Sequence, residues 1–149
     1  MMNAQLLTVA TPHMHHMHHA CQHIEERRIR DKDESYNVFK VKVPEVPGFV
    51  FDVPADIFYV WHNDIFDLLR GIWLHDTLVR LYSLNLATGI IRDGTPGIAI
   101  VDPYYMRDAI LRMDHGVRAT VNYLKGFLQA YSDNATILMP YHPESDSGR

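Results

Sequence analysis

This 149-residue chain has almost no cysteine and no excess of positive charge. It contains one cysteine, which cannot form an internal disulfide bond, so nothing indicates an oxidising compartment and we expect an intracellular protein. Against 14 Lys and Arg stand 18 Asp and Glu, a net charge of −4. Because no overall positive field attracts the chain to phosphates, nucleic acid is not expected as a partner.

Long apolar segments and common catalytic motifs are missing too. No window reaches the roughly 18 apolar residues of a membrane span, so we expect none. The first ten residues lack Lys and Arg, which gives no recognisable signal peptide. The sequence also has no Gly-x-Ser-x-Gly nucleophile motif and no glycine-rich phosphate loop. We therefore assign no catalytic residue.

The composition is that of a globular protein, with 47% hydrophobic, 11% aromatic and 21% charged residues. The length is close to that of a common single domain. We expect a histidine-rich, charged N-terminal arm or helix over 1–35, one α+β domain over 36–140, and a polar C-terminal tail over 141–149.

The periodicity of apolar residues predicts the elements of this domain. Residues 39–43 alternate between apolar and lysine side chains, which predicts a strand in a β-hairpin with 49–53. Further short strands are expected within 90–101, on both sides of an Asp-Gly turn, and at 136–139. Helical stripes predict helices over 54–73, 74–89, 104–113 and 117–131. We therefore expect an α+β fold with three to four helices packed on a small, mainly antiparallel sheet.

Aromatic residues form a second line on the helix predicted between Pro54 and Trp73. Tyr59, Phe66 and Trp73 recur every seven residues on the side opposite the apolar stripe, with His62 at the edge of this line. Tyr104 and Tyr105 follow Asp102-Pro103, which is typical of a helix N-terminus. Tyr and Trp are enriched at protein interfaces, so our leading hypothesis is a non-catalytic binding or assembly subunit that docks into a homo-oligomer or larger complex. The alternative is that the sheet of the same chain covers these rings.

Residues 13–23 contain six of the ten histidines and the only cysteine. If this segment is helical, His15, His16, His19 and His23 share one face, with Glu26 one turn further along it. Imidazoles on one face can bind a divalent transition metal, and His15, His19, His23 and Glu26 are the predicted ligands. His15 and His23 lie about 12 Å apart along a helix axis, so one ion can take neighbouring histidines but not all three. The simpler interpretation is a flexible polar arm.

The segment 68–76 ends in His75-Asp76 and resembles the His-Asp doublet of HD-type metal-dependent phosphohydrolases. The resemblance covers nine residues and implies a metal held by these two side chains with His62 before them and Asp114 after them. Such a metal would acidify a bound water for hydrolysis. The alternative interpretation is that His75 is a partly buried, hydrogen-bonded histidine.

Overall fold

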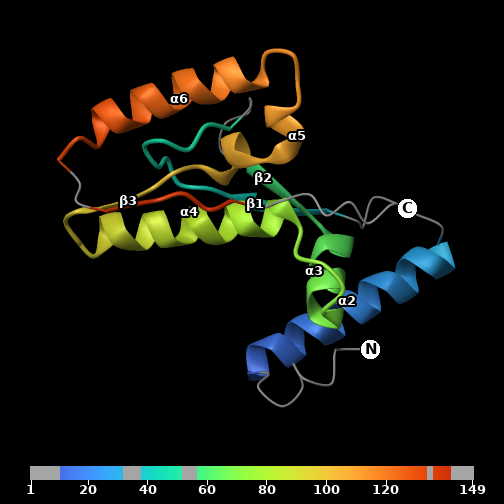
Figure 1. Cartoon of the computed structure of the whole chain (residues 1–149). Coiled ribbons are helices and arrows are strands. Elements are labelled where there is room, and N and C mark those ends of the chain that lie inside the picture. Colours follow the sequence, from blue (N-terminus) through green and yellow to red (C-terminus); the bar gives the residue numbers. More distant parts are fainter. Residues whose placement is uncertain (1–10, 32–37, 52–56, 134–135, 142–149) are drawn as a thin grey trace. The chain divides into compact units, whose positions relative to one another are not determined.

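The computed structural model describes residues 11–31, 38–51, 57–133 and 136–141. Five α-helices, one 3-10 helix and two strand pairs lie within these ranges, which confirms the α+β class. The chain divides into two compact units, one of Met1–Val43 with Ile57–Leu78 and one of Pro44–Asp56 with Val79–Arg149. In chain order the elements are α2 (Pro12–Asp31), β1 (Val38–Lys42), β2 (Ile57–Trp61), α3 (His62–Arg70), α4 (Asp76–Arg92), β3 (Ile98–Ile100), η2 (Pro103–Met106), α5 (Asp108–Leu111), α6 (Gly116–Ala130) and β4 (Thr136–Leu138) (Figure 1).

An antiparallel ribbon of β1 and β2 belongs to the first unit. Phe58 and Val60 are buried on one side of the ribbon. On the other side Lys40 lies directly opposite Tyr59, and Trp61 is also exposed. Alternation of this kind is expected for β-branched and aromatic residues in a strand with one wet face.

Helix α3 follows β2 without a linker and packs against α2. Gly71 ends α3 with a φ of 67°, a left-handed conformation that glycine adopts without a steric penalty. Cys21 of α2 and Leu69 of α3 are both buried, and the partly buried Ile65 and Phe66 pack against them. The histidine-rich segment is therefore a helix with a packed face.

The second unit is built on the parallel pair β3 and β4. Parallel strands need a crossover connection, and η2, α5 and α6 supply it. Figure 1 shows α4 and α6 on opposite sides of this pair. A core cluster of this unit consists of Ala99, Val101 and Phe127, with Met106, Tyr123, Leu124, Tyr131 and Ile137 packed against it.

Gly48 closes a turn that brings residues 46–49 onto this core, with the Phe49 amide donating to the Val46 carbonyl. Its φ is 88°, and a Cβ atom built there would lie 2.8 Å from the Phe127 ring. Only glycine combines this backbone conformation with so close a contact.

Several predicted elements are confirmed and others are wrong. The strand within 39–43 is present, but it pairs with Ile57–Trp61 and not with 49–51, while residues 52–53 of the predicted partner lie outside the described residues. The helix predicted over 54–73 is wrong at 57–61, which is a strand, and residues 54–56 lie outside the described residues. Alternating burial of β-branched and aromatic side chains outweighed the helical stripe there.

The later half of the chain shows the same mixture of outcomes. Helix α4 continues past Gly89 to Arg92, so the strand expected at 90–91 is wrong, while β3 and β4 are confirmed. The helix predicted over 104–113 is divided into η2 and α5. One of the two strand pairs is parallel, which differs from the mainly antiparallel sheet that we expect. The division at residues 35 and 140 stays a prediction.

None of the helices in the described part of the chain has the length and apolar character needed to cross a bilayer.

Candidate functional site

The buried face of α2 carries His18 and Cys21. Cys21 is 0% exposed, and burial raises the pKa of its thiol. A neutral, enclosed thiol is neither a good nucleophile nor a ready metal ligand. Burial also lowers the pKa of His18, with smaller contributions from the charges of His19, His15 and Arg70, and the Nε2 atom of His18 has no hydrogen-bond partner.

His62 connects α3 to this face. Its ring is 0% exposed, and its Nε2–H donates to the Cys21 carbonyl oxygen at 2.8 Å. Its Nδ1 atom makes no hydrogen bond and lies 3.9 Å from Oε2 of Glu25. The ring stacks on Phe66 with 5.5 Å between ring centroids. His62 is thus an internal contact between two helices, and its assignment to a docking surface is wrong.

The opposite, outer face of α2 presents histidines to solvent. His19, His23 and Glu26 are exposed, and Nδ1 of His23 lies 4.0 Å from Oε2 of Glu26. His15, the fourth predicted ligand, is half-buried at the edge of this face, and the exposed His16 lies nearer its middle. Among the residues that the structure describes, no group of three or more His, Cys, Asp or Glu is arranged to hold a metal ion.

His75 lies between two carboxylates of α3. Its Nε2 is 3.1 Å from Oδ2 of Asp67, and its Nδ1 is 3.4 Å from Oδ1 of Asp64. A neutral imidazole carries one N–H, so only the imidazolium can donate to both carboxylates. Burial raises the pKa of Asp64, against opposing contributions from His75 and Thr77, and its Oδ2 is buried without a hydrogen-bond partner.

This arrangement differs from the set that the phosphohydrolase resemblance implies. The two ring nitrogens of His75 face different carboxylates, and His62 is engaged with the Cys21 carbonyl. The side chain of Asp76 accepts from the Thr77 amide at 2.8 Å, and Asp114 is exposed before α6. The structure therefore supports the alternative interpretation of His75 as a partly buried, hydrogen-bonded histidine.

The predicted aromatic line does not lie on one helix. Tyr59 is on β2 and 45% exposed, while Phe66 is on α3 and half-buried. The guanidinium of Arg70 lies 3.8 Å from the centroid of the Phe66 ring. Trp73 follows the end of α3 and is half-buried. The line is wrong because its first ring belongs to a strand, and sequence reasoning missed Trp61, which is 53% exposed on the same ribbon face as Tyr59.

Tyr104 and Tyr105 pack within the second unit. Tyr105 stacks on Tyr123 with 4.0 Å between centroids, and Tyr104 meets Tyr105 edge to face. The guanidinium groups of Arg80 and Arg107 lie 4.8 and 4.4 Å from the centroid of the Tyr104 ring. Both tyrosines are half-buried, so most of their contact area is used inside the unit.

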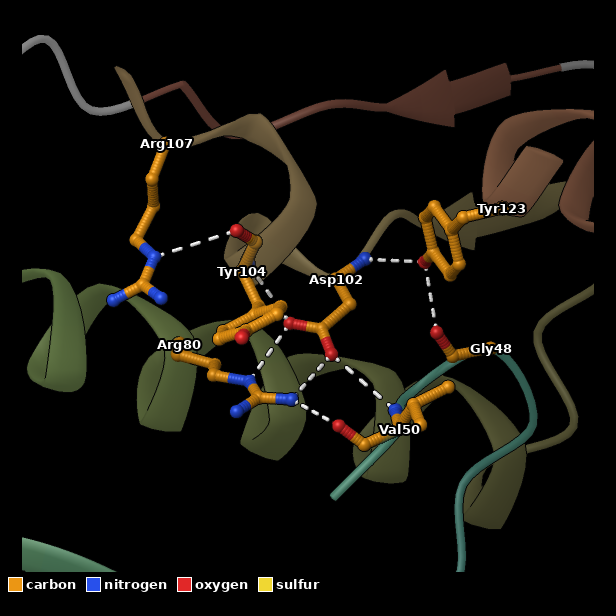
Figure 2. A network of polar contacts seen from close by, with 7 residues as sticks. All are labelled: Gly48, Val50, Arg80, Asp102, Tyr104, Arg107 and Tyr123. Atoms are coloured by element: carbon orange, nitrogen blue, oxygen red, sulfur yellow. Dashed lines mark hydrogen bonds and ion pairs between the residues drawn. The ribbon is translucent and has the colours of Figure 1, made fainter. Parts of the chain in front are cut away.

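Asp102 is the centre of the polar network in Figure 2. Its carboxylate is 0% exposed and accepts from Arg80 Nε at 2.8 Å and from the second guanidinium nitrogen at 2.6 Å. It also accepts from the amides of Val50 and Tyr104, the second as the predicted N-cap. The hydroxyl of Tyr123 accepts from the Asp102 amide. The network is a structural anchor for residues 48–50.

Helix α6 leaves a different kind of surface. Val117, Val121 and Leu128 are 57%, 43% and 51% exposed. We call these three residues the α6 stripe. The spacing of Val117, Val121, Leu124, Leu128 and Tyr131 predicts one core-facing stripe. Leu124 and Tyr131 do pack against the core beside Phe127, whereas the three residues of the α6 stripe are exposed. The predicted helix is confirmed, and the prediction of its buried face is right for Leu124 and Tyr131 and wrong for the α6 stripe.

Comparisons with known protein families, with curated proteins and with solved structures find no match to this chain.

Proposed function

We propose that this chain is a non-catalytic binding or assembly subunit that associates with a second copy through the α6 stripe. The observation that carries this proposal is the exposure of Val117, Val121 and Leu128 along one side of a regular helix. Stripes with helical spacing are the usual signature of a face that packs on another element. Burying one such side chain contributes about 1.5–3 kcal/mol.

Charge beside the stripe supports this partner. Arg118 and Lys125 are exposed on α6, and the helix has no Asp or Glu. A partner surface that combines apolar and acidic side chains complements this face. A copy of the same chain, with a net charge of −4, can supply acidic groups.

Light scattering of the full chain tests the proposal. We expect a mass above the 17.2 kDa of one chain, and a return to that mass in Val121→Asp. Asn122→Asp is the matched control, because it adds the same charge to an exposed neighbour outside the stripe. A monomer at every concentration, or equal masses for both variants, would overturn the proposal.

A further inference from the structure

Two exposed histidines of α2 lie one helical turn apart. His19 and His23 are at positions i and i+4, so their Cβ atoms are separated by about 6 Å on one side of the helix. Two imidazoles with this spacing can meet at one metal ion, as they do in helical His-x-x-x-His pairs. From these positions we propose that His19 and His23 together chelate a divalent transition metal.

Glu26 supports this pair through the ring of His23. Its Oε2 lies 4.0 Å from Nδ1 of His23, the nitrogen on the side of the next turn. In metal-binding histidines a carboxylate near one ring nitrogen orients the ring so that the other nitrogen faces the metal. Nε2 of His23 is then the ligand atom.

The ligand set determines which ions fit. Cys21 lies between the two histidines in sequence, but its side chain is 0% exposed on the opposite, buried face of α2. The site therefore offers imidazoles without thiolate, which selects copper(II), nickel(II) or zinc(II) and not copper(I). Water completes the coordination, because the helix supplies two ligands.

Chelation has a structural consequence, since the bridged turn is the one that packs on α3. Cys21 contacts Leu69, and its carbonyl accepts from His62, within the span between His19 and His23. A metal bound only by the folded helix raises the stability of this packing by mass action. The first unit is then metal-responsive, independently of self-association through α6.

The test is a calorimetric titration of the full, untagged chain with nickel chloride, and then with zinc chloride. We expect one ion per chain, and a thermal midpoint that rises with metal concentration. His19→Ala and His23→Ala should each weaken binding at least about tenfold, and Glu26→Gln by up to about tenfold. His13→Ala is the control, because His13 is exposed outside this pair and should leave affinity unchanged.

His15→Ala separates the proposed turn from the preceding one, since His15 and His19 share the same spacing. Loss of binding in His15→Ala with retention in His23→Ala would overturn the assignment. Equal affinity for the wild type, His19→Ala and His23→Ala would overturn the site itself. Metal affinity does not depend on the oligomeric state, so this test of the metal site is independent of the proposal that the α6 stripe mediates self-association.

Discussion

Asp64 and Asp102 are buried carboxylates with opposite surroundings. In the second unit, Asp102 accepts from a guanidinium and two amides. In the first unit, Asp64 has the His75 ring at 3.4 Å from one oxygen and no hydrogen-bond partner at the other. Among the described residues, the buried side-chain atoms without a hydrogen-bond partner are His18 Nε2, His62 Nδ1 and Asp64 Oδ2, and all three belong to the first unit.

This difference separates a fixed structure from a responsive one. A buried charge with complete hydrogen bonding holds its neighbours in one arrangement. A buried group with an atom that lacks a hydrogen bond makes an unfavourable contribution to the free energy of folding, and binding a proton or changing the structure can remove it. We therefore expect the first unit to respond to pH and ions, while the second resists both.

Removing the cation of the closed network should have the largest effect. Arg80→Met leaves the Asp102 carboxylate buried without its guanidinium, and we expect a loss of about 3–5 kcal/mol in the free energy of unfolding. Urea denaturation measures this loss. Arg92→Met is the control, because Arg92 is exposed on the same helix and pairs with its neighbour Asp93, so its midpoint should not move. A loss under about 1 kcal/mol in Arg80→Met would mean that the ion pair with Arg80 does not stabilise the Asp102 carboxylate, and the contrast with Asp64 would fail.

Neutralising Asp64 should have the opposite sign. Burial raises the pKa of Asp64 above its ordinary 3.8. At a pH between 3.8 and the folded value, the folded chain therefore keeps a proton on Asp64 that the unfolded chain has released. The free energy of unfolding then falls as pH rises from 3.8 through the folded value. Asp64→Asn removes this loss, so at pH 7 the variant should be more stable by about 1 kcal/mol, the scale for one unpaired buried group.

Denaturation of Asp64→Asn between pH 4 and pH 8 measures the effect, with a gain that grows with pH and then levels. Asp67→Asn is the matched control on the same helix. It removes the negative charge from the 3.1 Å contact with His75 and should destabilise the chain. If Asp64→Asn were also destabilising at pH 7, the Asp64 carboxylate would be satisfied and the comparison with Asp102 would fail.

Local patterns in the sequence predicted the elements whose signal is local. Asp102-Pro103 predicted a cap, and Asp102 accepts from the Tyr104 amide as expected. The period-two run at 39–43 predicted β1. Residues 57–61 fit a helical stripe and a strand equally well, because all five side chains are apolar or aromatic and so match either period. Pairing with β1, a tertiary contact, decided between them.

Contacts between distant positions left no such signal. Arg80 and Asp102 are 22 residues apart, and nothing in either segment indicates their pairing. The outward side of α6 was missed because apolar or aromatic residues extend around two neighbouring faces of the helix. Phe127 and Tyr123 pack on the core, since larger rings bury more area, and this leaves the smaller Val117 and Val121 outside.

The smallest effect should come from His18, a second unpaired group of the first unit. Burial lowers the pKa of His18 below its ordinary 6.5, so the unfolded chain takes up a proton before the folded chain does. The contribution of His18 to the free energy of unfolding is therefore largest above pH 6.5, and it falls as the pH decreases toward the pKa of His18 in the folded chain. His18→Leu removes this slope, which we expect to amount to at most about 1 kcal/mol, while His16→Leu, at an exposed position, should preserve it. An unchanged slope in His18→Leu, measured by urea denaturation between pH 5 and pH 7, would show that the burial of His18 does not contribute to the pH response of this unit.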